Sequence, residues 1–229
     1  MKTLKSLLVT FILTIAIMFS TRAQNVVLFT DGFEAGLSQW TGFNGGLTSG
    51  FIVSDPLGSG SQVLSFNGIG YLGDIFTLSP ISVVGTTSVK VRFDYLGKGV
   101  AGSIPDNFGG FVGLATTLTE GSGGWIAGTL PSAVNGAGFE GIHILDDGNW
   151  HSYEVDVTSV IQNNSWSSIF VKLEDWGDAG PVGDVFFDNI SVVATVPEPS
   201  SHALIIGSGL ALLTQFKMRK GFRANNRFS

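Results

Sequence analysis

Short runs in which apolar and polar residues alternate dominate the middle of the chain. In the clearest of them, SVKVRFDYLG, every second residue from Val89 to Tyr95 is apolar, and charged residues stand between them. This period of two places one set of side chains on each face of an extended strand. Comparable runs are QVLSF, GDIFTL, GGFVGLAT, GFEGIHIL, WHSYEVDV, SSIFVKLED and DVFFDNISVV. The middle of the chain is therefore predicted to be built of strands.

Turn-forming residues separate these runs. Clusters of Gly, Asn, Asp and Ser lie between them, and many short strands joined by such turns are typical of an antiparallel sandwich. We therefore predict an all-β domain over residues 24–195, in which two antiparallel sheets pack as a jelly-roll sandwich. The single helical pattern, TSVIQ at residues 158–162, predicts a short helix.

The N-terminus has the composition of a secretory signal peptide. Lys2 and Lys5 precede an uncharged apolar run from Leu7 to Phe19, and Ala23 is a small residue suited to cleavage. That run would span only about 20 Å as a helix, less than the roughly 30 Å of a membrane's hydrocarbon core. We predict that residues 1–23 are removed and that the protein is exported. An uncleaved N-terminal anchor is the alternative.

The C-terminal residues 196–229 combine a stiff stretch, an apolar run and a basic tail. In VPEP, two prolines hold the backbone extended. Residues 200–216 would span about 26 Å as a helix, at the lower end of what crosses a membrane. Basic residues in the tail, residues 217–229, favour its retention in the cytoplasm. We predict a single transmembrane helix over about 200–216, with the body outside. An ordinary anchor with a proline-containing stalk stays possible.

The charge of the body limits its partners. Residues 24–195 contain four basic and 17 acidic residues, a net charge of −13. Nucleic acid and anionic surfaces are poor partners for a body of this charge, whereas cations are favoured. The chain has no cysteine, so disulfides cannot stabilise it outside the cell.

Catalytic motifs are scarce. The chain has no GxSxG elbow for a serine hydrolase, and its two body histidines, His143 and His151, lie in strand patterns. The acidic clusters DDGN and EDWGDAG are explained by turn formation. We therefore predict a protein that is not an enzyme. A glycosidase needs only two carboxylates that converge in space, so a carbohydrate-active enzyme stays open as an alternative.

Two tryptophans are candidates for sugar contacts. Trp125 in SGGWIAG and Trp176 in EDWGDAG lie in polar or glycine-rich surroundings, where an exposed indole can stack on a sugar ring. The alternative is that each covers an end of the sandwich. Trp40, Trp150 and Trp166 flank strand patterns and are predicted to lie in the core.

The C-terminal segment resembles the PEP-CTERM sorting signal, which combines a Pro-Glu-Pro motif, a short membrane helix and a basic end. The resemblance implies that Pro197, Glu198 and Pro199 are recognised by an exosortase in the membrane. It also implies a surface or extracellular-matrix protein associated with exopolysaccharide, anchored in the inner membrane before sorting. The tail GFRANNRFS continues beyond the basic cluster, where members of the family usually end.

The body resembles galactose-binding-like sandwiches, the fold of many carbohydrate-binding modules. The resemblance rests on FTDGFEAGLSQWTGF near its start and VFFDNISVV at its end. It implies a structural calcium ion, with Glu34 and Asp188 as carboxylate ligands and Asp31 as a weaker candidate. The function expected is thus a non-catalytic protein of the cell surface or matrix, with a glycan-binding lectin or a carbohydrate-active enzyme as the alternative.

Overall fold

The computed structural model describes residues 23–66, 75–98, 108–119, 122–129, 141–177 and 184–197. Residues Asn25 to Val196 form one compact unit. The predicted transmembrane helix, Glu198, Pro199 and all of the signal peptide before Ala23 lie outside the described residues. In the described part of the chain, no helix is both long and apolar enough to cross a membrane.

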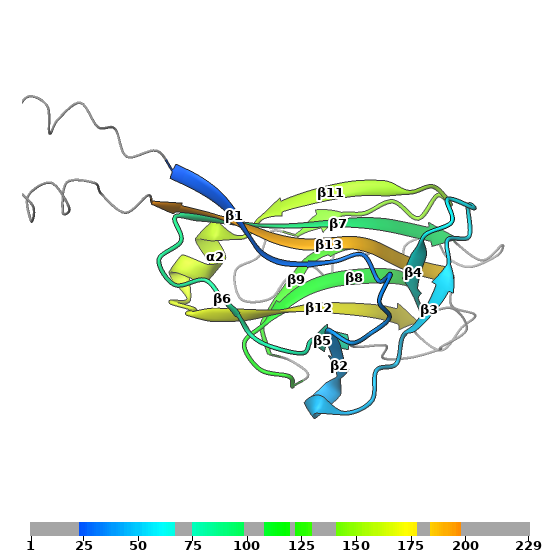
Figure 1. Ribbon diagram of the computed structural model, residues 1–229, viewed down its shortest axis with the longest axis horizontal. Coiled ribbons are helices and arrows are strands. Elements are labelled where there is room, and N and C mark those ends of the chain that lie inside the picture. Colours follow the sequence, from blue (N-terminus) through cyan, green and yellow to red (C-terminus); the bar gives the residue numbers. More distant parts are fainter. Residues whose placement is uncertain are drawn as a thin grey trace, which may run out of the picture. The chain divides into compact units, whose positions relative to one another are not determined.

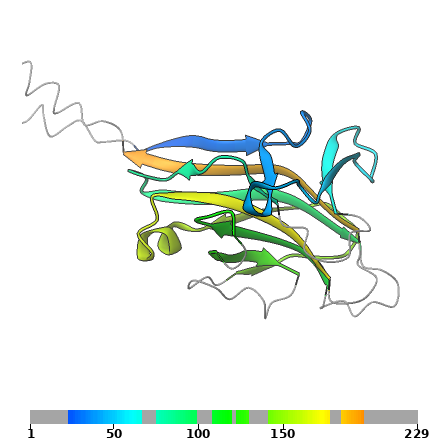
Figure 2. The same ribbon diagram turned by 90° about the horizontal axis from the view of Figure 1, so that it is seen from below.

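One sheet has six strands in the order β11-β7-β13-β4-β3, and β1 also pairs with β13. These strands are β1 (Ala23–Asp31), β3 (Phe51–Ser54), β4 (Gln62–Ser65), β7 (Ser88–Lys98), β11 (His151–Asp156) and β13 (Asp184–Pro197). β13 is the longest of them, and it contacts three other strands (Figure 1). β1 lies beside it and runs in the opposite direction (Figure 2).

The second sheet has seven strands in the order β10-β9-β8-β12-β5-β2, and β6 also pairs with β12. They are β2 (Trp40–Gly42), β5 (Ile75–Thr77), β6 (Ile81–Ser82), β8 (Phe108–Ala115), β9 (Gly124–Gly128), β10 (Ile142–His143) and β12 (Ser168–Gly177). A 3₁₀ turn, η1 (Phe43–Gly45), and the predicted helix, α2 (Thr158–Asn163), complete the described elements. The prediction of an all-β, two-sheet sandwich is confirmed.

The prediction of purely antiparallel sheets is wrong at one place, because β10 pairs with β9 in parallel, with Ile142 opposite Ala127. Thirteen residues, 129–141, separate the two strands. A connection of about a dozen residues is long enough to bring a chain back in its original direction, which a tight hairpin cannot do.

The core lies between the two sheets and follows the predicted alternation. In β7, every second residue from Val89 to Tyr95 is buried in one large hydrophobic cluster. β13 adds Phe187 to this cluster, and β8 passes close to it at Gly110. A side-chain carbon at Gly110 would lie 2.4 Å from Tyr95 and 2.7 Å from Phe187. A glycine is thus needed there for the two rings to pack.

The segment SGGWIAG forms a strand, β9, where the sequence suggested a glycine-rich loop. Trp125 stands opposite Gly113 of β8 in this pairing. Of the tryptophans predicted to lie in the core, Trp40 is buried and stacks on Phe33, with ring centroids 5.5 Å apart. Trp150 instead packs against a second, small cluster, which consists of Val63, Leu96 and Phe186.

Candidate functional site

A cleft of about 430 Å³ lies on the outer face of the β11-β7-β13-β4-β3 sheet. We call it the acidic cleft; it is lined by Gly32, Glu34, Asp55, Ser59, Ser61, Asp94, Trp150, Asp188 and Asn189. Four of these residues are acidic, and no basic residue is among them. The cleft therefore has the strongly negative character that the composition of the body predicts, concentrated at one place.

An irregularity in β13 positions the middle of the cleft. Phe187 and Ile190 are both fully buried in the core, although a regular strand would place residues three apart on opposite faces. The register between β13 and β7 shifts between Asp188 and Ser191, and Asn189 has a φ of 50°. This β-bulge turns Asp188 and Asn189 both toward the cleft.

Asn189 connects the two strands beneath the cleft. Its backbone N–H donates to Asp188 Oδ1 at 2.7 Å, and its side-chain Nδ2 donates to Asp94 Oδ2 at 2.7 Å. Asp94 is also the residue directly opposite Asp188 in the pairing of β7 with β13. Two carboxylates therefore face each other across strands, an arrangement that destabilises a sheet unless something offsets their repulsion.

Burial and neighbouring charges raise the pKa of Asp188 to about 6. Its side chain is 9% exposed, so loss of hydration is the main cause, and the charges of Asp94, Glu34 and Asp55 add to it. The N–H of Asn189 acts in the opposite direction, because it stabilises the ionised form. Asp188 is thus the group in the cleft that gains most from protonation or from a nearby cation.

Asp55 holds one wall of the cleft. Its Oδ1 accepts the N–H of Leu57 at 2.9 Å and the indole N–H of Trp150 at 3.0 Å, and its Oδ2 accepts the N–H of Ser59 at 3.0 Å. Burial alone would raise the pKa of Asp55, but a hydrogen bond from the Ser59 side chain, together with these three, lowers it to about 2. Both oxygens are occupied, so Asp55 fixes its loop and the indole of Trp150 rather than offering a ligand atom.

The structure brings together two of the three predicted metal ligands. Glu34 is exposed at the turn after β1 and lines the cleft with Asp188; its Oε1 accepts the N–H of Gln62 at 3.1 Å. Asp31 does not line the cleft. Its Oδ1 accepts the N–H of Phe33 and its Oδ2 accepts the indole N–H of Trp40, both at 2.8 Å. Asp31 therefore holds the turn that carries Glu34.

The cleft fits a hard cation in chemistry but not as a preformed cage. Asp188, Asp94 and Glu34 each use one oxygen in the hydrogen bonds above, and the described residues donate none to the second oxygen. Within the described residues, however, no three acidic or histidine side chains lie close enough together to form a ligand group. Calcium there requires Glu34, whose side chain is exposed, to move inward, with water or backbone oxygens as further ligands.

A second, smaller depression continues the cleft along the same sheet face. It encloses about 360 Å³, shares Asp94 and Asn189 with the acidic cleft, and adds the side chains of Arg92, Ser152, Glu154 and Ser191. Arg92 Nε lies 2.7 Å from Glu154 Oε2, and Lys90 also pairs with Glu154. The two hollows together present carboxylates, a carboxamide, hydroxyls and a guanidinium along one surface.

The predicted sugar contacts lie elsewhere. Trp125 is half-buried on β9, in the other sheet, and Lys172 Nζ lies 3.5 Å from the centroid of its ring. Phe111 packs against the same indole, with ring centroids 5.4 Å apart. One face of Trp125 is thus covered by a cation. The prediction of a turn at EDWGDAG is wrong for Glu174 to Gly177, which belong to β12. Trp176 is among them, and its side chain lies outside the described residues.

Asp146 has a second role that its DDGN turn did not suggest. Asp147 makes the expected turn, since its Oδ1 accepts the N–H of Asn149 at 3.0 Å. Asp146 instead bonds to the buried hydroxyl of Tyr95, and burial together with the charge of Asp147 raises the pKa of Asp146 to about 6. It does not line the acidic cleft.

Sequence reasoning missed Asp94, Asn189 and the role of Trp150. The bulge did leave a signal, because the apolar positions of VFFDNISVV change phase between Phe187 and Ile190. Nothing in the sequence pairs Asp94 with Asp188, which are 94 residues apart. That juxtaposition comes from the pairing of β7 with β13.

Comparisons with known proteins do not assign this chain to a family. No protein-family model and no curated protein matches the sequence. The CBM22-2 xylan-binding domain of Paenibacillus barcinonensis Xyn10C is similar in structure, with 12% identity, a TM-score of 0.44 and coverage of 73% of this chain and 99% of that one. The K3 cleaved adhesin domain of Lys-gingipain from Porphyromonas gingivalis is similar at 13% identity and a TM-score of 0.46, over 74% and 99% of the two chains. At these values the likeness concerns the β-sandwich fold alone.

Asp188 provides a test of the electrostatics of the cleft. The folded protein binds a proton at Asp188 more tightly than the unfolded chain does, so the contribution of this group to the free energy of unfolding falls as the pH rises from about 4 to 6. Asp188→Asn keeps an oxygen for the Asn189 N–H. In chelator at pH 7 we expect it to raise the free energy of unfolding by roughly 1–2 kcal/mol, allowing for screening by solvent, with no effect at pH 3.5.

Urea unfolding as a function of pH measures this effect. Asp146 also has a pKa raised to about 6, but its contribution is the same in variant and parent and cancels in the difference between their free energies of unfolding. Glu154→Gln is the control of opposite sign. Hydrogen bonds from Lys90 and Arg92 lower the pKa of Glu154, so its replacement should reduce stability at pH 7. Equal stability of Asp188→Asn and the parent at pH 7 would contradict the conclusion that the ionised carboxylate of Asp188 destabilises the fold.

Proposed function

We propose that this protein is an exported, non-catalytic β-sandwich that binds polysaccharide outside the cell through the acidic cleft and its extension. The observation that supports this is the convergence of an indole, carboxylates, a carboxamide and hydroxyls on one sheet face. Sugar hydroxyls are donors and acceptors that such groups satisfy, and an aromatic side chain offers the apolar surface that sugar rings need.

The charge of the cleft selects the kind of polysaccharide. Its acidic side chains have no basic residue among the other residues of the lining, so an anionic polymer would be repelled. Arg92 in the extension is already paired with Glu154. The proposed ligand is therefore a neutral polysaccharide, whose hydroxyls donate to the carboxylates.

We also propose that a calcium ion strengthens the cleft, with Glu34 and Asp188 as ligands and Asp94 as a third. The support is electrostatic: Asp94 and Asp188 face each other across strands, and the pKa of Asp188 is raised. A divalent cation offsets this repulsion and lets both carboxylates stay ionised. Asp31 is not part of this proposal, because both of its oxygens accept hydrogen bonds.

The proposed route to the outside is the signal peptide followed by sorting at the PEP-CTERM segment. An exosortase would recognise Pro197, Glu198 and Pro199 while residues 200–216 hold the chain in the inner membrane. The described residues support this in one respect, since β13 extends as far as Pro197, which is exposed at its end. The chain is then released to the cell surface or the matrix.

One observation favours a catalytic alternative. Asp188, with a pKa of about 6, faces a second carboxylate, and a glycosidase pairs a carboxyl of raised pKa with a carboxylate on the other side of the bond. If the protein is a glycosidase, it releases reducing ends from the polysaccharide, and Asp188→Asn abolishes this release. A binding protein retains the polymer unchanged.

Glycan binding is tested with Asn189→Gly. Glycine accepts the φ of 50° but removes the carboxamide from the cleft. We expect the change to weaken binding about tenfold, the equivalent of one lost hydrogen bond. Affinity electrophoresis of the body, residues 24–196, through gels that contain neutral or anionic polysaccharides measures it.

Asn44→Gly is the matched control, since Asn44 is also an exposed asparagine with positive φ, at 54°, and does not line the cleft. Trp125→Ala tests the other sheet face. Equal loss of binding in Asn189→Gly and Asn44→Gly, or loss only in Trp125→Ala, would show that the cleft is not the glycan site.

Calcium binding is tested by thermal unfolding of the body with and without a chelator. Calcium at about 100 times its Kd is expected to add about 2.7 kcal/mol to the free energy of unfolding. Asp188→Ala and Glu34→Gln should abolish this gain. Asp31→Asn should lower stability in both conditions and keep the gain. If calcium does not change the Tm of the parent protein, the calcium proposal is wrong.

Sorting is tested by mass spectrometry of the mature protein from cells that contain an active exosortase. The proposal expects an N-terminus at Gln24 and a C-terminus close to Pro199. Replacement of Glu198 by alanine should leave the C-terminal tail in place. An intact C-terminus at Ser229 in the parent would contradict the sorting proposal without bearing on the cleft.

A further inference from the structure

The first and last strands of the sandwich start and finish at the same end. Thr195 near the end of β13 donates from Oγ1 to Asn25 Oδ1 near the start of β1, at 2.9 Å. In Figure 1 the start of β1 and the end of β13 lie together, next to β6 and α2. The predicted signal peptide and the predicted membrane segment are therefore both connected to this end of the sandwich.

The covalent chain limits how far this end can be from a membrane. Thr195 is fixed in the sheet, because its carbonyl accepts the N–H of Thr87 at 2.8 Å and it stands opposite Ser88. Five residues lead from Thr195 to Ser200, where the predicted membrane segment begins. Five extended residues reach at most about 17 Å. An anchored sandwich must therefore keep this end close to the lipid.

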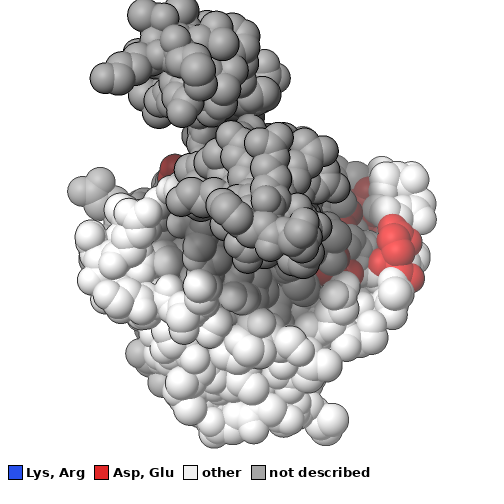
Figure 3. Space-filling view, turned by 60° about the vertical axis from the view of Figure 1, so that its left-hand side comes forward, with Lys and Arg blue, Asp and Glu red and all other residues white. Residues whose placement is uncertain are grey.

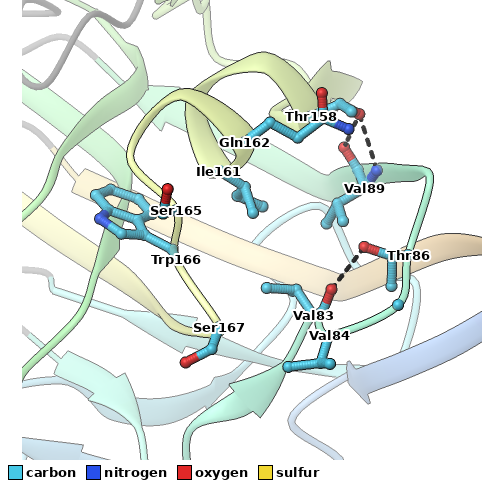
Figure 4. Close-up of a pocket in the computed structure, with 11 residues that line it drawn as sticks. Val83, Val84, Thr86, Val89, Thr158, Ile161, Gln162, Ser165, Trp166 and Ser167 are labelled. Carbon is cyan, nitrogen blue, oxygen red and sulfur yellow. Dashed lines mark hydrogen bonds between the residues drawn. The ribbon is translucent and has the colours of Figure 1, made fainter.

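The same end carries an uncharged, partly apolar hollow of about 280 Å³ (Figure 4). Valine and isoleucine side chains form much of its lining, namely Val83, Val84, Val89 and Ile161, and Trp166 stands at its side. Val84 is 72% exposed, which is high for an apolar side chain. No acidic or basic residue belongs to the lining.

Two hydroxyls of the hollow are already bonded within the protein. Thr158 Oγ1 accepts the N–H of Val89 at 2.9 Å, and Thr86 Oγ1 donates to the carbonyl of Val83 at 2.8 Å. Both bonds are drawn in Figure 4. Contact with a less polar phase therefore leaves neither of these two hydroxyls unsatisfied. The other polar side chains of the lining, those of Gln162, Ser165 and Ser167, need the polar headgroups of the lipid as partners.

The acidic cleft lies well away from this end. Asp188 precedes Thr195 by seven residues along β13, which corresponds to about 23 Å of strand. Figure 3 shows most of the described surface in this view as uncharged, with acidic side chains at the right and a smaller acidic patch at the upper left. An orientation with this end toward the membrane keeps the carboxylates of the acidic cleft more than a Debye length from anionic headgroups. One exposed carboxylate stays at this end, because Asp156 Oδ1 accepts the N–H of Thr158, and it stands opposite Lys90 in the pairing of β11 with β7.

We propose that the end formed by the β6–β7 turn and α2 rests on the lipid surface while the chain is anchored. Val84 enters the headgroup region, and Trp166 lies at the interface, where indoles are favoured because they are apolar with one polar N–H. The acidic cleft then faces away from the membrane, toward extracellular polymer. The inference rests on the proposed function, because it requires the membrane segment at 200–216.

The absence of cysteine from the chain makes a clean test possible. Val84→Cys and the control Leu57→Cys are each labelled with an environment-sensitive fluorophore in the full chain. Leu57 is 53% exposed and belongs to the loop that Asp55 holds beside the acidic cleft. The proteins are placed in vesicles of phosphatidylethanolamine and phosphatidylglycerol, and quenching by aqueous iodide is compared with quenching by spin-labelled lipid.

We expect iodide to quench the Val84 probe at least about threefold less than the Leu57 probe, and spin-labelled lipid to quench only the Val84 probe. The soluble body, residues 24–196, should show equal iodide quenching at both sites. A Val84 probe shielded in the soluble body as well would mean that protein covers the hollow, and this overturns the inference. Equal access of iodide in vesicles that retain the protein after carbonate extraction also overturns it, without affecting the anchor. Release by carbonate contradicts the anchor itself, and the inference with it.

Discussion

The pairing of β13 with β7 is the contact on which the rest of the structure depends. It runs from Asp184 opposite Lys98 to Thr195 opposite Ser88, the full width of the sandwich. β13 also pairs with β4 and β1, so its position sets the register of most of this sheet. Along one strand the chain supplies core residues, the bulge that shapes the acidic cleft, and the point where it leaves the fold. A shift in this register would disturb all three together.

The bulge at Asp188 and Asn189 shows how a small departure from regular geometry creates a site. A regular strand would bury one of these two side chains in the core. The extra residue keeps Phe187 and Ile190 inside and turns both polar side chains outward, beside Asp94. The cost is a left-handed backbone at Asn189 and a desolvated carboxyl at Asp188. A strained backbone beside a buried carboxyl is typical of ligand-binding and catalytic sites.

The charged and the uncharged hollows of the described surface lie at different places, so the two ends of the domain differ in polarity. The acidic cleft takes its residues from the turn after β1, the Asp55 loop and the middle of β13. The uncharged hollow takes its residues from the β6–β7 turn and α2, where β13 ends. The function that we propose needs this separation, because a ligand would have to reach the acidic cleft while the chain is held at its other end.

The sequence by itself determined the class of fold, the alternation of β7, the short helix at Thr158 and the nearness of Glu34 to Asp188. These follow from local periodicity and from a match at the two ends of the domain. The tertiary structure alone decided that Asp31 bonds to Trp40, that Trp150 lines a cleft, and that Asp94 meets Asp188. The physical reason is that strand pairing joins residues far apart in the chain. Periodicity tells which face a side chain takes, but only the register between strands tells what it meets there.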